Sequence, residues 1–371
     1  MHIKTLNLLN FKSYQQTELV FHPRINCLVG NNGQGKTNLL DAIFYLSMTK
    51  SCFNALDSYN IKHEENFFVI QGLYEGNGRE ENLYCAVKRG EGKVFKRNGK
   101  EYERLADHVG LIPLVIISPA DMSLILDGSE ERRRFINSVI SQYNKSYLDQ
   151  VIRYNKLLAN RNRMLKDAGD SSGFPYDLLE VMDEQMAGLA DFIYEQRLQF
   201  ALNLTPIFQE HYSRVSGGTE DVRLEYHSHL AHGALHHLLR ENWARDRALQ
   251  FTSKGVHKDD LLLTLNGNPI KREGSQGQQK TFLIALKLAQ FHFMYRVSGV
   301  KPILLLDDIF DKLDMQRVQQ FIRLVADDGY GQIFITDTTK SHLDAILEQV
   351  KSGYSLFMVD NATVVEQRAK P

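Results

Sequence analysis

Cysteine, tryptophan and long apolar runs are scarce in this chain. Only three cysteines occur in 371 residues, at Cys27, Cys52 and Cys85, and none belongs to a C-x-x-C pair. The odd number argues against a disulfide framework, so we expect a reduced, cytoplasmic setting. The longest apolar stretches, such as Ile303–Leu306, have the length of strands. They fall well short of the roughly 18 residues that a membrane span needs, so we expect no membrane association.

An excess of charge of one sign is also missing, because 44 Lys and Arg residues stand against 45 Asp and Glu residues. Any nucleic-acid contact must therefore use local basic patches. The first residues show no basic-then-apolar leader, so we do not expect secretion. With 43% hydrophobic and 24% charged residues, the composition is that of a globular protein, and 371 residues leave room for two domains.

Residue patterning predicts an α/β domain that is interrupted by a helical insertion. Residues 1–120 contain strand-like segments, with two strands expected within residues 1–29 and hairpins within residues 67–105. Helical periodicity dominates residues 121–248, where two long stretches joined by a polar loop indicate an antiparallel helical hairpin. From Leu261 onward strands and helices alternate, which favours a largely parallel sheet. We therefore expect residues 1–120 and 249–371 to form one discontinuous domain, with residues 121–248 as the insertion.

The strongest functional signal is a complete G-x-x-x-x-G-K-[ST] sequence between a predicted strand and a predicted helix. Its glycines let backbone N–H groups turn inward around phosphate oxygens, and the helix adds its positive end. Lys36 places a charge on the β- and γ-phosphates, and Thr37 offers a hydroxyl to Mg²⁺. The predicted ATP-binding residues are Gly30, Asn31, Asn32, Gly33, Gln34, Gly35, Lys36 and Thr37.

Two aspartates follow the predicted strand Ile303–Leu306. We expect Asp307 to hold Mg²⁺, directly or through water, and Asp308 to orient or deprotonate the attacking water. Asp308 and Lys36 are therefore the predicted catalytic residues. Two aspartates after a strand are common at protein surfaces, so this assignment depends on the P-loop being present as well.

A third motif, Ser275-Gln276-Gly277-Gln278-Gln279, precedes an amphipathic helical segment. In a structural interpretation, Ser275 is an N-cap and Gln278 completes a capping box. In a functional interpretation, this helix N-terminus presents N–H groups and a serine hydroxyl to the γ-phosphate bound by a second copy. The functional interpretation predicts a head-to-tail pair of protomers with ATP between them.

In this order, and split by a helical insertion, the three motifs resemble those of ABC-type ATPase heads of the SMC class. The match narrows to the bacterial RecF family. It includes Leu6-x-Leu8-x-Asn10-Phe11-Lys12-Ser13-Tyr14, Ser118-Pro119-Ala120-Asp121, Gly255-Val256-His257-Lys258-Asp259-Asp260 and Leu305-Leu306-Asp307-Asp308. The resemblance implies an ABC-type P-loop head with a mixed sheet and an inserted, mainly helical domain. It also implies a D-loop at a dimer seam, on Asp311, Lys312, Leu313 and Asp314.

The resemblance further implies a recombination mediator that binds ATP and Mg²⁺, dimerises on ATP and engages gapped or junction DNA. RecF proteins work with RecR and RecO and help to load RecA onto single-stranded gaps, and slow ATP hydrolysis resets the dimer. Thr336 follows a strand after which many ABC heads place a switch histidine, and Asp308 replaces a longer glutamate. Both departures fit a weak ATPase. Lys258 stands where RecF proteins more often have arginine.

Basic clusters are candidates for sequence-independent contacts with double- and single-stranded DNA. The predicted contacts are Lys88, Arg89, Lys93, Lys96, Arg97, Arg132 and Arg133. A further cluster near the tip of the helical hairpin consists of Lys156, Arg161, Arg163 and Lys166. Any single charge run is more often a solvated face than a binding site. No base-reading motif is found, so we expect recognition of DNA shape through its backbone.

A group of histidines has no assigned role: His227, His229, His232, His236 and His237. The i,i+4 pair His232 and His236 could hold a metal, but a polar helix face is the commoner explanation. Three other functions compete with this one. An ABC subunit that drives a membrane transporter is disfavoured by the large helical hairpin and the opening strand motif. Another SMC-like DNA-handling ATPase would be marked by a long coiled coil or an appended nuclease, and neither is found. A nucleotide switch in which hydrolysis is incidental differs only in its turnover.

Overall fold

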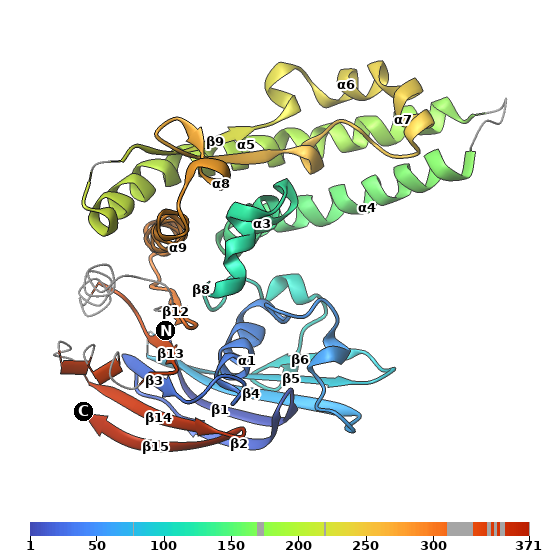
Figure 1. Cartoon of the computed structure of the whole chain (residues 1–371). Helices are drawn as coiled ribbons and strands as arrows, with labels where there is room; N and C mark the ends of the chain where they lie inside the picture. The colour runs from blue at the N-terminus through green and yellow to red at the C-terminus, as the bar shows by residue number, and fades with distance from the viewer. Residues whose placement is uncertain are drawn as a thin grey trace. The chain divides into compact units, whose positions relative to one another are not determined.

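The computed structural model describes residues 1–76, 78–168, 174–218, 220–309, 329–339, 343–344, 347–348 and 353–370. The chain divides into two compact units. The first unit comprises Met1–Met122, His211–Gly218 and Lys280–Pro371, and the second comprises Ser123–Glu210 and Thr219–Gln279. Each unit is described by itself below (Figure 1).

The first unit contains two six-stranded sheets. One is antiparallel, in the order β2-β1-β4-β5-β6-β7. Its strands are β1 (His2–Phe11), β2 (Tyr14–Val20), β4 (Phe67–Gly76), β5 (Arg79–Lys88), β6 (Lys93–Arg97) and β7 (Lys100–Glu101). The hairpins expected within residues 67–105 are therefore present, whereas residues 1–29 hold three strands instead of the two expected, because β1 and β2 form a hairpin of their own.

The second sheet of this unit is mixed, in the order β15-β14-β3-β13-β12-β8. Its strands are β3 (Ile25–Val29), β8 (Leu114–Ile117), β12 (Ile303–Leu306), β13 (Ile333–Asp337), β14 (Tyr354–Asp360) and β15 (Thr363–Lys370). All neighbours are parallel except the edge strand β15, which is antiparallel to β14. Every residue of β3, β8, β12 and β13 is buried, as expected for short apolar strands in a covered parallel sheet.

The helices follow the periodic segments of the sequence. In the described part of the chain they are α1 (Lys36–Met48), α2 (Ser123–Leu126), α3 (Ser129–Tyr143), α4 (Lys145–Ala168), α5 (Tyr176–Ser216), α6 (Leu235–Glu241), α7 (Trp243–Leu249), α8 (Ile270–Glu273) and α9 (Gln276–Ser298). Among the described residues, none of the helices is both long enough and apolar enough to cross a membrane.

Helices α4 and α5 run antiparallel in the second unit, as the sequence predicts. Arg161 of α4 donates to Asp183 of α5, while Arg197 of α5 donates to the hydroxyl of Tyr147 of α4. The partner on α5 moves toward lower numbers as the position on α4 moves toward higher ones, which defines an antiparallel pair. Both arginines are buried, so these contacts lie inside the unit.

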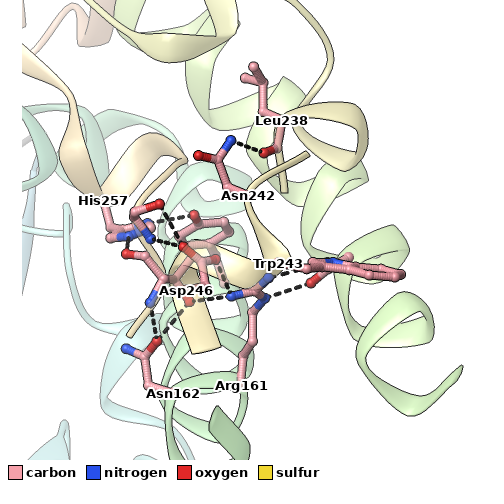
Figure 2. Close-up of polar contacts among 11 residues, drawn as sticks. Arg161, Asn162, Leu238, Asn242, Trp243, Asp246 and His257 are labelled. Carbon is pink, nitrogen blue, oxygen red and sulfur yellow. Dashed lines mark hydrogen bonds and ion pairs between the residues drawn. The ribbon is translucent and has the colours of Figure 1, made fainter. Parts of the chain in front are cut away.

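Arg161 is the centre of a buried polar network that joins three helices (Figure 2). Its guanidinium donates to Asp183 at 2.7 Å, to Asp246 of α7 at 2.7 Å and to the Thr252 hydroxyl at 3.0 Å. The indole of Trp243 also donates to Asp183, at 2.8 Å. Burying an arginine is tolerable when carboxylates and hydroxyls satisfy its donors, and here two aspartates do so.

His257 belongs to the same region of the second unit (Figure 2). Its Nδ1 lies 2.9 Å from the Tyr154 hydroxyl and its Nε2 lies 3.0 Å from the Thr252 carbonyl oxygen. Since a carbonyl can only accept, Nε2 carries the proton and Nδ1 accepts from the tyrosine. Burial lowers the pKa of His257 to about 4, so this imidazole is neutral at pH 7.

A third, small antiparallel sheet differs from the expectation. It consists of β9 (Val222–His227), β10 (Asp260–Leu265) and β11 (Asn268–Pro269), in the order β11-β10-β9. A strand therefore lies within residues 121–248, where mostly helical patterning was expected, and alternate residues at its start, Val222 and Leu224, are buried. The strand at residues 261–265 pairs with β9 rather than with the large sheet, so residues up to Gln279 group with the helical unit.

Candidate nucleotide-binding site

The P-loop connects β3 to α1, which is the context that the motif requires. Gly33 and Gly35 have φ values of 82° and 110°, in the left-handed region that glycine adopts without steric cost. A Cβ atom on Gly30 would lie 2.1 Å from the carbonyl oxygen of Val359 in β14. The three glycines therefore let the loop turn tightly while its backbone packs against a neighbouring strand.

Lys36 lies over this loop and is only 4% exposed. Its ammonium donates to the carbonyl oxygens of Gly30 at 2.7 Å and Asn31 at 3.0 Å. The start of β2 also contacts the loop, because the Tyr14 hydroxyl donates to the Gly35 carbonyl oxygen at 3.1 Å. The ammonium thus lies within the loop that the sequence predicts to hold phosphates.

A hairpin turn from the far end of the chain also contacts the P-loop. The N–H group of Asn361 donates to Oε1 of Gln34 at 2.5 Å, and that of Ala362 donates to the Gln34 carbonyl oxygen at 3.0 Å. Asn361 and Ala362 connect β14 to β15 with φ values of 47° and 56°. Two successive positive φ values are those of a type I′ turn, which matches the twist of a two-stranded hairpin.

Thr37 and Asp307 meet although 270 residues separate them in sequence. The Thr37 hydroxyl lies 2.9 Å from each carboxylate oxygen of Asp307, which follows the end of β12. Burial raises the pKa of Asp307, while hydrogen bonds from Thr336 and Thr37 oppose the shift. A threonine hydroxyl and a carboxylate are oxygen ligands of the kind that Mg²⁺ prefers, so the pair fits the predicted metal site.

Thr336 links both aspartates and was not recognised from the sequence as a site residue. It lies in β13, between the P-loop strand β3 and the acidic strand β12. Its buried hydroxyl donates to Asp307 at 2.8 Å and accepts from the Asp308 N–H group at 3.0 Å. Asp308 has a φ of 44°, which is uncommon for a residue other than glycine. The sequence does contain a signal for Thr336. It is a polar residue at the carboxyl end of a strand, and that strand lies next to the acidic strand.

Ser275 and Gln278 form the capping box at the start of α9. The Gln278 N–H group donates to the Ser275 hydroxyl at 3.3 Å, and the Ser275 N–H group donates to the Gln278 side chain at 2.8 Å. The Gln279 side chain donates to the Gly274 carbonyl oxygen at 3.1 Å. The role of Gln276, Gly277 and their neighbours toward ATP on a second copy stays a prediction. The predicted D-loop residues Asp311, Lys312, Leu313 and Asp314 lie outside the described residues.

Most of the predicted DNA contacts already have partners within the protein. The contacts are Lys88 with Glu91 (2.5 Å), Lys93 with Asp57 (2.7 Å), Arg97 with Glu81 (2.5 Å), Arg132 with Asp260 (2.6 Å), and Arg133 with the Ser129 hydroxyl and the Asp259 carbonyl oxygen (both 2.7 Å). Within the described residues, Arg89 and Lys96 form no ion pair. Arg161 does not belong to a solvated basic cluster, because it is fully buried.

The histidine group does not form a metal site of the predicted spacing. His232 ends a 3₁₀ turn (His229–His232), whereas His236 lies in α6, so the pair is not on one helix. Within the described part of the chain, no group of three or more His, Cys, Asp or Glu side chains is arranged to hold a metal ion.

The P-loop strand and the acidic strand are separated by one strand in a mixed sheet, and a long insertion divides their motifs. This arrangement defines an ABC-type ATPase head of the SMC class. The family model described as RecF/RecN/SMC N terminal domain matches residues 2–364. A solved Smc head bound to the C-winged helix domain of ScpA has a TM-score of 0.60, with 16% identity over 99% of this chain and 98% of that one. At this identity, the likeness concerns the fold alone.

The sequence relatives narrow the assignment. The DNA replication and repair protein RecF of Phocaeicola vulgatus is 52% identical over 99% of both chains, and that of Flavobacterium johnsoniae is 49% identical over 96% of this chain and 99% of its own. A solved structure of the recombination mediator protein RecF-ATP in the RecFOR pathway has a TM-score of 0.89 and 29% identity, covering 99% of this chain and 98% of that one. The chain belongs to the RecF family of DNA replication and repair proteins, which confirms the resemblance and the fold class.

Proposed function

We propose that this chain is a DNA-binding recombination mediator that uses MgATP to pair two copies of itself. The observation that carries the proposal is the arrangement of Thr37, Asp307 and Thr336 beside a P-loop of the required backbone geometry. The likeness to a RecF structure solved with ATP supports the choice of nucleotide.

In this proposal, the amides of residues 30–35 and the Lys36 ammonium bind the phosphates. The ammonium now donates to two loop carbonyls, and phosphate oxygens would replace them as acceptors. Thr37 and Asp307 would hold Mg²⁺, which neutralises charge on the β- and γ-phosphates when bound. Asp308 would orient the attacking water, and Thr336 would fix the positions of both aspartates. With aspartate in place of the longer glutamate, turnover is expected to be slow.

Pairing is proposed to depend on the capped start of α9. The Ser275 motif of one copy would contact the γ-phosphate held by the other, through the helix N-terminus and the serine hydroxyl. The D-loop, at Asp311–Asp314, would lie at the same seam. The paired form would engage gaps and junctions in DNA through the backbone, and would act in the cytoplasm with RecR and RecO to help load RecA.

The test is sedimentation of the full chain with and without MgATP and gapped DNA. We expect a dimer with MgATP, a longer-lived dimer for Asp308→Asn, and a monomer that still binds ATP for Ser275→Arg. Ser275 is exposed, so an arginine side chain at this position can extend into solvent. A wild-type chain that stays monomeric at saturating MgATP and DNA would refute the proposal.

A further inference from the structure

The second unit contains a surface pocket of about 480 Å³ that the nucleotide site does not use. Residues from the end of β9, from the following 3₁₀ turn and from the segment before β10 line it. The residues that matter for its chemistry are His227, Ser228, His229, His232, Lys258 and Asp260. Three of the five grouped histidines and two residues of the Gly255–Asp260 segment therefore lie around one depression.

Two carboxylates near this pocket, Asp259 and Asp260, are paired with arginines, whereas the exposed Glu225 lies 3.6 Å from His227. Asp260 accepts two hydrogen bonds from the Arg132 guanidinium, at 2.6 and 3.0 Å. Asp259 is buried directly beside it and accepts from Arg197 at 2.6 Å and from the Tyr226 hydroxyl. The Lys258 ammonium has no carboxylate partner among the described contacts and lies 5.0 Å from the centre of the Phe251 ring.

A further cation lies next to these pairs. Arg133 donates to the Ser129 hydroxyl and to the Asp259 carbonyl oxygen, both of which are neutral. Burial and the neighbouring Arg197 lower the pKa of Arg133. Positive groups therefore outnumber carboxylates around the pocket even while its histidines are neutral, and such a surface attracts anions.

The histidines provide hydrogen-bond donors rather than a metal site. Nδ1 of His229 accepts from the Gly255 N–H group at 3.4 Å, so the proton of a neutral His229 is on Nε2. The described residues include no cluster of three metal ligands, although three imidazoles line one pocket. Imidazole N–H groups and an ammonium together match the several acceptor oxygens of a phosphate group, whereas the Ser228 hydroxyl is already bonded to Asp259 and to the Leu230 N–H group.

We propose that this pocket binds a phosphate group. The phosphate is either one in a DNA backbone, in which case the inference rests on the proposed function, or a free phosphate ion. A pocket of about 480 Å³ is in the size range of sites for molecules larger than one ion, which favours a phosphate carried by a nucleic-acid strand. In this proposal, Lys258 and the histidines contact the phosphate. Arg132 and Arg133 do not touch it, but hold Asp260 and Asp259 in place beside the pocket.

Binding is expected to tighten as the pH falls, because protonated imidazoles add positive charge. The charged groups that face these histidines determine how strongly the affinity depends on pH. Glu225 lies 3.6 Å from His227, and burial and Lys254 lower the pKa of His229. Lys258 adds charge of the same sign, and Asp259 and Asp260 are held by Arg197 and Arg132. The affinity for a DNA phosphodiester, which keeps one negative charge throughout this range, should therefore be higher at pH 6 than at pH 8.

The experiment compares a pocket variant, Lys258→Gln with His232→Gln, with a control variant, Lys271→Gln with His237→Gln. All four positions are exposed, so both variants should fold, and equal thermal unfolding temperatures check this. In the first arm, inorganic phosphate is titrated into the full chain while histidine NMR signals are recorded at pH 6 and pH 8. In the second arm, binding of labelled gapped duplex is measured with MgATP across a range of salt concentrations.

A DNA contact predicts that the pocket variant binds gapped duplex at least fivefold more weakly and that its salt slope falls by about 1, while the control changes less than twofold. A free-phosphate site predicts saturable shifts of histidine signals that are lost in the pocket variant, with DNA binding unchanged. No difference between the variants in either arm would overturn the proposal. A wild-type chain that binds no DNA would refute the proposed function. The phosphate titration would still test whether the pocket binds phosphate.

Discussion

The nucleotide site and the buried network around Arg161 contain comparable numbers of polar contacts, yet the sequence specifies them differently. The P-loop is a continuous segment whose glycines and lysine determine its shape locally. The Arg161 network takes its members from α4, α5, α7 and the loop after α7, so it exists only once these elements are packed. A motif on one segment can be recognised by its spacing, whereas a network of distant partners cannot.

The two regions should also respond differently to substitution. The network holds charge in the interior, so its loss should reduce stability. The nucleotide site holds its charged residues for a ligand, so their loss should reduce binding and leave stability nearly unchanged. Three substitutions test this contrast.

The largest effect is expected from Arg161→Met. The substitution leaves Asp183 and Asp246 buried without their cation, which should reduce the free energy of unfolding by about 3–5 kcal/mol. Thermal or urea unfolding measures the change. Arg163→Met is the matched control, since this neighbouring arginine of α4 is exposed, and its effect should stay within about 0.5 kcal/mol. Equal stabilities of the two variants would show that the network is not stabilising.

An effect on binding rather than on stability is expected from Lys36→Met. Loss of charged hydrogen bonds to phosphate should cost about 1.5–3 kcal/mol of binding free energy, which is roughly 10- to 100-fold in the dissociation constant of ATP. Calorimetric titration with MgATP measures it, with the exposed Lys50→Met as the control. If Lys36→Met reduced stability as much as Arg161→Met does, the contrast between the two regions would fail.

A smaller effect is expected from Thr336→Val, which preserves shape but removes a hydroxyl. The Asp307 carboxylate loses a donor and the Asp308 N–H group loses its acceptor, at a cost of about 1–3 kcal/mol, so ATP turnover should fall by roughly fivefold or more. The hydrogen bond from Thr336 lowers the pKa of Asp307, so its removal raises that pKa. The acid side of the pH–rate profile should therefore move to higher pH.

Thr338→Val is the control for this variant, because Thr338 is exposed two residues further on. Turnover is measured at saturating MgATP over a range of pH. If the Thr336→Val chain had the rate and the pH profile of the wild type, Thr336 would have no role in ATP turnover.

The sequence predicted the elements whose signals are local. The P-loop, the acidic strand end, the capping box at Ser275 and the helical hairpin all follow from spacing and periodicity within a few turns of the chain. In the sequence, Thr336 was noted only because many ABC heads have a histidine at this place. Its contacts with both aspartates depend on β13 lying between β3 and β12, and the sequence does not give this order of strands. The strand β9 was missed because six residues within a helical region give a weak alternation signal, and its partner β10 was therefore placed in the wrong sheet.

Basic clusters were the least reliable signal. Charge along a sequence does not reveal whether a carboxylate from another element lies opposite, and Arg97 and Arg132 both have such partners, at 2.5 and 2.6 Å. Arg161 is the clearest case, since its charge and its basic neighbours in the sequence suggest a solvated side chain, whereas it is completely buried.

The contact between Gln34 and the turn at Asn361 and Ala362 bears on how the protein is made. During translation the loop for the nucleotide leaves the ribosome long before the strands that brace it, because β14 and β15 lie more than 300 positions downstream. A nascent chain that has not reached β15 lacks this contact, so its P-loop is not yet braced by the turn at Asn361 and Ala362. We therefore expect full ATP affinity only after β14 and β15 have been synthesised and have joined the sheet.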